Sequence, residues 1–127
     1  MFHTPEEIEI ADSVSIAAFV HIWGTGGVRI GNRTIIGSRT AIASVTDDYQ
    51  SPQVHRTKVT MRIEVGSGVW IGSHVFVGAG LKIGDGAVIG AGSVVTHDVP
   101  ADAIAVGVPA TVARIDQAWL RNDFRAC

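Results

Sequence analysis

Aliphatic residues recur at every sixth position along most of this chain, and this period limits its fold more than any other feature. The longest run holds Val65, Ile71, Val77, Ile83, Ile89 and Val95, and shorter runs of three begin at Ile10 and Ile30. In most of these repeats a glycine follows the aliphatic residue. An α-helix would need apolar residues at steps of three and four, and an ordinary strand would alternate by two. A period of six with glycine in a constant phase predicts a β-helix, in which each hexapeptide supplies one short strand and one corner.

Two breaks in this period mark insertions into the regular turns. The step from Ile22 to Ile30 is eight residues, and the step from Ile42 to Val65 is twenty-three. Three hexapeptides make one triangular turn, and each break follows a completed set of three, so both insertions are expected at the same edge of the prism. The longer one, residues 46–62, carries several apolar and aromatic side chains. A long loop of this kind on a regular scaffold is usually functional.

The 127 residues predict a single all-β domain with a β-helix of about four turns over residues 8–98. The loop 46–62 is expected to protrude, and an extension over residues 99–127 is expected to hold a helix near 116–125. Ten basic and twelve acidic residues form no basic stripe, which disfavours nucleic-acid binding. The single cysteine, Cys127, disfavours a disulfide framework, and the sequence has no signal-like or membrane-spanning run. A soluble, cytoplasmic protein is therefore expected.

Apolar side chains outside the repeat phase predict that the chain associates with itself. Phe19, Val75, Phe76 and Val94 add more apolar surface than the interior of a short prism requires. Flat prism faces that carry such residues would be buried between identical copies.

The segment VGSGVWIGSHVFVGAGLKIGDGAVIGAGSVVTHDVPADAIAVGVPATVARI resembles the hexapeptide-repeat acyltransferases, above all the O-acetyltransferases that act on sugars and polysaccharide precursors. The resemblance covers residues 24–115, and VWIGS, IGAGSVVTHDVP and GVPA are its most specific parts. It implies a left-handed parallel β-helix, a homotrimer, and acetyl-CoA bound in a cleft between adjacent subunits. It also implies transfer of the acetyl group to a hydroxyl or an amine of a sugar or nucleotide-sugar, with no metal.

The resemblance assigns donor-side roles to residues in the second half of the chain. Trp70 would line the acetyl-CoA cleft, with the equal alternative that its indole fills a face of the trimer, and Ser73 would place a hydroxyl near the thioester. The other implied positions, along the pantetheine and near the nucleotide, are Gly78, Ala79, Ala91, Thr96, His97 and Arg114. His97 and Thr111 stand where relatives often have a lysine and an arginine, so the binding of the CoA phosphates is expected to be weaker or pH-dependent.

The acceptor side departs from the pattern of the family. Relatives carry a catalytic histidine where the loop begins, and the aligned residue in SVTDDYQSP is Asp47. An aspartate is a much weaker base than a neutral imidazole at pH 7. Either His55 from the same loop is the base, or burial makes Asp47 basic enough to act, or the protein binds CoA or sugar without turnover. His21, beside the shorter insertion, is a second histidine candidate, and a solvated or interface role for His55 stays open.

Two other enzyme families use this scaffold with residues that the chain lacks. Serine acetyltransferases carry HGTG, and in the corresponding stretch WGTG the histidine is replaced by Trp23. The γ-type carbonic anhydrases need three interface histidines for zinc, and His55, His74 and His97 lack the close second pair of that family. A sugar acetyltransferase is the favoured prediction, and a non-catalytic binding or assembly module is the alternative.

Overall fold

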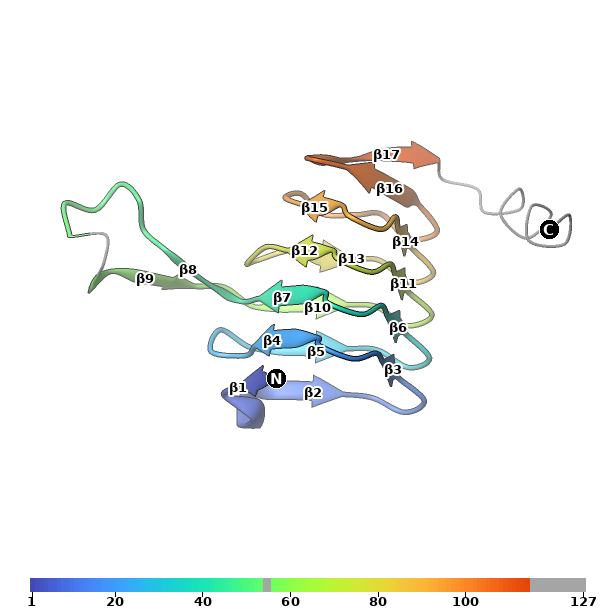
Figure 1. Cartoon of the computed structure of the whole chain (residues 1–127), viewed down its shortest axis with the longest axis horizontal. Helices are drawn as coiled ribbons and strands as arrows, with labels where there is room; N and C mark the ends of the chain where they lie inside the picture. Colours follow the sequence, from blue (N-terminus) through green and yellow to red (C-terminus); the bar gives the residue numbers. More distant parts are fainter. Residues whose placement is uncertain (54–55, 115–127) are drawn as a thin grey trace, which may run out of the picture.

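The computed structural model describes residues 1–53 and 56–114, which form short strands joined by tight corners (Figure 1). The elements are β1 (Phe2–His3), η1 (Pro5–Glu7), β2 (Ile8–Ile10), β3 (Ser15–Ile16), β4 (His21–Trp23), β5 (Val28–Ile30), β6 (Ile35–Ile36), β7 (Ala41–Ala43), β8 (Val45–Asp47), β9 (Lys58–Thr60), β10 (Ile63–Val65), β11 (Trp70–Ile71), β12 (Phe76–Val77), β13 (Lys82–Ile83), β14 (Val88–Ile89), β15 (Val94–Val95), β16 (Ile104–Gly107) and β17 (Ala110–Arg114).

Three parallel sheets form the faces of a triangular prism. Face A is β1-β4-β7-β12-β15, face B is β2-β5-β10-β13, and face C is β3-β6-β11-β14-β16, to which β17 adds in antiparallel orientation. As the chain climbs in Figure 1, the nearer strands β4 and β7 run to the left and the fainter, more distant β5 and β10 run to the right. A path that turns this way while rising is left-handed, so the predicted left-handed parallel β-helix is confirmed.

The prism is longer than the hexapeptide count predicted. Face A stacks five parallel strands, so the structure has about five turns rather than four. Strand β1 pairs with β4, and β16 pairs with β14, so the predicted bounds 8–98 are too narrow at both ends. The paired residues at these ends are 20 and 16 positions apart in the sequence (Phe2↔Ile22 and Val88↔Ile104). Backbone pairing therefore continues at both ends, although the period of six does not. The helix predicted near 116–125 lies outside the described residues.

Two inward positions per hexapeptide fill the prism. The predicted aliphatic residues are buried from Ile22 to Val95, whereas Ile10, in the terminal strand of face B, is 40% exposed. A second buried position lies two residues earlier in each repeat and holds Val20, Val28, Thr34, Thr40, Ile63, Val69, Val75, Leu81, Ala87 and Ser93. The assignment of Val75 to the surface is therefore wrong, because the last corner residue before each strand also points inward.

Crowding between stacked turns explains several of the glycines that follow an aliphatic residue of the repeat. A Cβ added to Gly37 would lie 2.6 Å from the carbonyl carbon of Gly72, and one added to Gly72 would lie 2.7 Å from the amide nitrogen of Ala91. At these positions backbone atoms of the next turn occupy the space that a side chain would need. Gly78 has more room, with its nearest contact at 3.5 Å. Elsewhere the same phase is taken by Trp23, Ala43 and Thr96.

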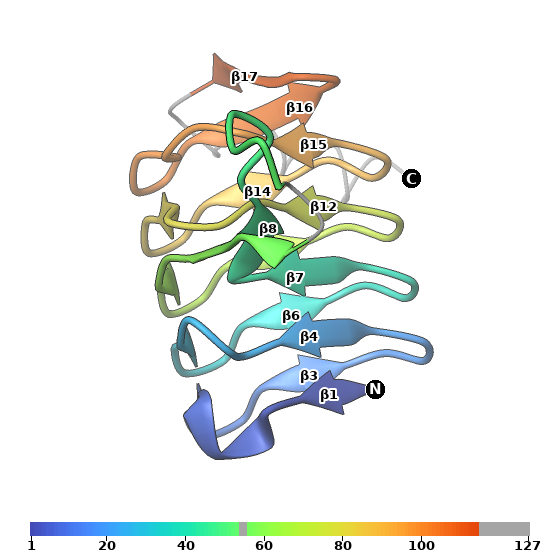
Figure 2. The ribbon, with the colours of Figure 1, turned by 90° about the vertical axis from the view of Figure 1, so that its left-hand side faces the viewer.

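Both insertions lie at the edge between faces A and B, as predicted. Paired strands are 20 residues apart across the first insertion (His21↔Ala41) and 35 apart across the second (Ala41↔Phe76). The longer insertion is an antiparallel hairpin rather than an irregular loop, with β8 paired to β9. This hairpin arm, residues 45–53 and 56–60, stands away from the prism in Figure 1 and faces the viewer in Figure 2.

No helix within residues 1–53 and 56–114 is long and apolar enough to cross a membrane.

Candidate functional site

The outer surface of face B is charged. One column across its strands holds Glu9, Arg29, Glu64 and Lys82 in register. Arg29 pairs with Glu9 at 3.7 Å, and Arg62 pairs with Glu64 at 3.4 Å, all with well-exposed side chains. Opposite charges in register stabilise a face that stays in contact with solvent. The outer surfaces of faces A and C are more apolar, and the candidate sites lie on them.

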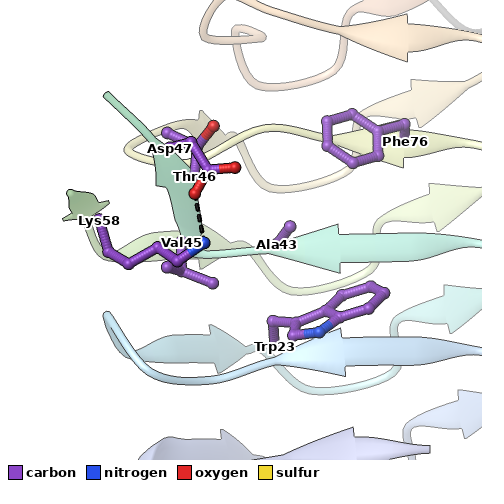
Figure 3. Close-up of a pocket in the computed structure, with 7 residues that line it drawn as sticks. All are labelled: Trp23, Ala43, Val45, Thr46, Asp47, Lys58 and Phe76. Carbon is purple, nitrogen blue, oxygen red and sulfur yellow. Dashed lines mark hydrogen bonds and ion pairs between the residues drawn. The ribbon is translucent and has the colours of Figure 1, made fainter. Parts of the chain in front are cut away.

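A pocket lies where the hairpin arm leaves face A, and we call it the arm pocket (Figure 3). Its volume is about 490 Å³, and it is lined by Trp23, Ala43, Val45, Thr46, Asp47, Lys58 and Phe76. The apolar residues come mainly from successive strands of face A, and the polar ones come from the arm. Figure 3 shows Ala43 between the two aromatic side chains.

Asp47, which stands at the position of the family histidine, forms an ion pair with Lys58 across the hairpin. The two side chains are 53% and 58% exposed, respectively. The burial that would make Asp47 a stronger base is therefore not present in this chain. His55, the preferred base, lies outside the described residues.

A second pocket, the face C pocket, contains three of the predicted donor-side residues. Its volume is about 370 Å³, and it is lined by Gly37, Trp70, Gly72, Ser73, Val88, Ile89, Gly90 and Ala91. The structure thus brings together Trp70, Ser73 and Ala91, which the resemblance placed near the thioester and the pantetheine. The Oγ of Ser73 accepts a hydrogen bond from the Oγ of Ser38 at 3.3 Å.

Residues 62–97 match the family model described as bacterial transferase hexapeptide (six repeats). This segment of the chain carries the hexapeptide repeats that the family model describes. The fold of the chain is similar to that of a hexapeptide-repeat-containing acetyltransferase from Vibrio cholerae, solved with acetyl coenzyme A, at 29% identity and a TM-score of 0.85, over 89% of this chain and 63% of that one.

A galactoside acetyltransferase in complex with coenzyme A is 31% identical with a TM-score of 0.86, over 91% of this chain and 59% of the other. A maltose O-acetyltransferase from Clostridium difficile is 26% identical with a TM-score of 0.85, over 90% and 63%. The predicted resemblance to hexapeptide-repeat acyltransferases is confirmed, and the chain spans about three fifths of the length of these enzymes. No curated protein sequence matches the chain.

Other predicted donor-side residues lie on a different edge from the face C pocket. Gly78, followed by Ala79, and Thr96 lie at the edge between faces A and B, and the amide of Gly78 donates to the carbonyl of Val95 at 3.2 Å. The hydroxyl of Thr96 lies 3.0 Å from Nδ1 of His97. The width of face A separates this group from Trp70, so one copy of the chain does not gather all of them. Arg114 ends β17, next to β16 at the end of face C.

Two histidines support the indole of the arm pocket. His3 stacks on Trp23 with ring centroids 5.1 Å apart and an interplanar angle of 4°, and the ring of His21 lies 5.3 Å from Trp23 at 39°. His21 and Trp23 flank the buried Ile22 and so project from the outer side of face A. The sequence does not predict this contact of His3, because β1 lies outside the period of six and its pairing with β4 leaves no periodic signal.

Within the described part of the chain, no group of three or more histidine, cysteine, aspartate or glutamate side chains could hold a metal ion.

Proposed function

We propose that this protein is an acetyl-CoA-dependent acetyltransferase whose acceptor is a hydroxyl or an amine of a sugar or nucleotide-sugar. The face C pocket carries the proposal, because Trp70, Ser73 and Ala91 meet there on a fold shared with acetyltransferases solved with coenzyme A. Small residues along this pocket leave room for an extended pantetheine to lie against the backbone.

Ser73 suits a role at the thioester. Its Oγ already accepts a hydrogen bond from Ser38. A serine hydroxyl has one proton to donate and two acceptor lone pairs, so the proton of Ser73 stays available for the carbonyl oxygen. A donor aimed at that oxygen would stabilise the oxyanion of the tetrahedral intermediate.

The proposed reaction is direct transfer without a covalent enzyme intermediate. The acceptor oxygen or nitrogen attacks the thioester carbonyl carbon, and a general base takes its proton. The tetrahedral intermediate then collapses, the C–S bond breaks, and the CoA thiolate leaves and takes up a proton.

We propose His55 as this general base and Asp47 as a positioning or fallback group. The ion pair with Lys58 supports a positioning role for Asp47, because the carboxylate that would take up the proton is already paired with the ammonium. His21 stays the second candidate, since it contacts the indole of the arm pocket.

A homotrimer with acetyl-CoA between subunits remains a proposal, and the surface chemistry supports it. Trp70 and Ile35 on face C and Phe76 on face A are 39%, 49% and 43% exposed, whereas face B is charged. A copy that set its face C against the arm-bearing edge of a neighbour would bury apolar area and complete the divided donor site. The cytoplasmic location also stays a prediction.

The donor assignment is tested by calorimetry with acetyl-CoA. We expect binding by the wild type, about three- to tenfold weaker binding by Trp70→Ala, the usual worth of one aromatic contact, and no change in Glu9→Gln on the charged face B. Absence of acetyl-CoA binding by the wild type at millimolar concentration would refute the proposal. A screen for CoA thiol release with sugars and nucleotide-sugars then tests turnover.

One observation favours a second candidate, a non-catalytic CoA- or sugar-binding homologue. The position of the family histidine holds Asp47, already paired with Lys58. Acetyl-CoA binding without thiol release on any acceptor would select this candidate.

A further inference from the structure

We propose that Ser38 is a positioning residue, which holds the hydroxyl of Ser73 so that its proton points at the carbonyl oxygen of a bound thioester. The inference rests on the proposed function, because it adds a residue to the donor side of that reaction. Ser38 itself would not touch the ligand, and its effect would pass entirely through Ser73.

Ser38 and Ser73 occupy the same corner position in successive turns, at the edge between faces C and A. Each lies two residues after a strand of face C, and these strands, β6 and β11, are paired in register. The carbonyl of Ser38 accepts from the amide of His74 at 2.9 Å. The carbonyl of Ser73 accepts from the amide of Gly92 at the same distance. Backbone hydrogen bonds between turns therefore fix the two serines relative to each other.

The two hydroxyl groups form a short chain that ends in the face C pocket. Ser38 Oγ donates to Ser73 Oγ at 3.3 Å, and of these two serines Ser73 lines the pocket. The turns on either side hold Ala18 and Ala91 at this corner position, and a methyl group accepts no proton. A hydroxyl that donates onward becomes a better acceptor, so a ligand carbonyl bound by Ser73 would shorten the bond from Ser38.

The equivalent serine at another edge uses its hydroxyl differently. Ser67 occupies the same corner position between faces B and C, and its Oγ accepts from the backbone amide of Asn32 at 3.1 Å. The amide of Ser67 donates in turn to Oδ1 of Asp85 at 2.8 Å. Side chains at that edge thus bond to the backbone of the adjacent turn and hold the stack together. At the edge between faces C and A the bond joins two hydroxyl groups, and so it orients a proton.

Orientation matters because the side chain of Ser73 can turn about two bonds. The χ1 torsion and the hydroxyl each have three staggered positions, so an unrestrained Ser73 would adopt any one arrangement roughly one ninth of the time. The bond from Ser38 restricts both torsions before the ligand arrives. A donor that is already aimed at the oxygen where negative charge develops needs no reorganisation during the reaction. No covalent bond to either serine forms or breaks.

The test compares acetyl-CoA with S-ethyl-CoA, a thioether that lacks the carbonyl oxygen, by calorimetry. The ratio of the two dissociation constants reports the hydrogen bond to that oxygen and needs no turnover. We expect the wild type to prefer acetyl-CoA about three- to tenfold, the usual worth of one hydrogen bond. Ser73→Ala should abolish this preference, and Ser38→Ala should reduce it to less than about twofold, because Ser73 is then free to turn away.

Ser67→Ala is the matched control, because it removes the same group from the same corner position at an edge away from the pocket. It should lower the free energy of unfolding in urea and leave the preference for acetyl-CoA at the wild-type value. The double variant Ser38→Ala/Ser73→Ala should show the same preference as Ser73→Ala alone, since two residues that act as a unit are not additive.

A structural role for the pair predicts a different result. If Ser38→Ala weakens the binding of both ligands equally, the two serines only link adjacent turns, and the proposal is overturned. An unchanged preference in Ser38→Ala, or a further loss of preference when Ser38→Ala is added to Ser73→Ala, also overturns it.

The same measurements separate this inference from the proposed function. A wild type that binds both ligands equally well removes the role of Ser38 and leaves acetyl-CoA as the ligand. A wild type that binds neither ligand refutes the donor assignment and this inference together. A preference that depends on Ser38, without thiol release on any acceptor, supports the inference while the transferase fails. Where thiol release is found, Ser38→Ala should lower kcat more than it raises KM for acetyl-CoA, and an unchanged kcat counts against the proposal.

Discussion

The glycines of the hexapeptide phase are expected to be far less replaceable than the corner glycines. In Gly37→Ala, the new Cβ would lie 2.6 Å from the carbonyl carbon of Gly72 and 2.6 Å from the amide nitrogen of Ser73. Ordinary contacts of a Cβ begin at 3.4 Å, so the next turn must move by about 0.8 Å (3.4 minus 2.6). Both contacts are with backbone atoms, which cannot rotate away as a side chain would.

The cost has two parts. Overpacking of a close-packed region costs about 1–3 kcal/mol. The same displacement strains the hydrogen bond from the amide of Gly37 to the carbonyl of Ile71, now 2.8 Å long, and a bond of this kind is worth about 0.5–1.5 kcal/mol. The stiffer unfolded chain of a Gly→Ala variant offsets about 0.4–1 kcal/mol, so the free energy of unfolding should fall by about 0.5–4 kcal/mol in total.

Gly92→Ala is the matched control. Gly92 has a φ of +74°, and a Cβ there would meet nothing within 4 Å. The left-handed conformation costs an alanine at this position about 1–2 kcal/mol. The stiffer unfolded chain of the variant offsets about 0.4–1 kcal/mol of that cost. We therefore expect a net loss of about 0–1.6 kcal/mol in this variant.

The assay is urea unfolding followed by far-ultraviolet circular dichroism, at one protein concentration because association changes apparent stability. Gly37→Ala should lower the unfolding midpoint clearly more than Gly92→Ala does, with unchanged slopes. Equal losses in the two variants would refute the crowding explanation, because Gly37 does not have the positive φ that strains an alanine at Gly92.

Three further predictions concern the core, the base and the arm. Ile36→Ala should destabilise the protein by about 2–5 kcal/mol and its neighbour Ile35→Ala by under about 1 kcal/mol, since these side chains are 1% and 49% exposed; similar losses in urea unfolding would place both inside. Once an acceptor is known, His55→Ala should lower the rate of thiol release by about 10²–10⁴; a rate within about threefold of wild type, with that loss in Asp47→Asn, would move the base to Asp47. Lys58→Met should change the free energy of unfolding by no more than about 1 kcal/mol because its ion pair is exposed, and a larger loss would show that the pair holds the hairpin arm together.

The sequence by itself determined the scaffold, because the period of six is a local property of each repeat. An inward aliphatic residue such as Ile71 and a glycine such as Gly72 follow from one strand and one corner, whatever lies elsewhere in the chain. The common edge of the two insertions also follows from counting, since three hexapeptides return the chain to the same edge. The proximity of Trp70 and Ser73 was predictable for the same reason, as these residues lie three positions apart in one repeat.

Only the tertiary structure decided which side chains meet across turns. The pairing of β1 with β4 stacks His3 on Trp23, and the hairpin register sets Asp47 against Lys58. The arm pocket combines Trp23 and Phe76, fifty-three residues apart, with groups from an insertion that has no repeat of its own. Contacts of this kind depend on the stacking of turns and on the direction in which the arm leaves the prism. Neither has a periodic signature in the sequence, and so the arm pocket could not be predicted from the repeat that predicted the fold.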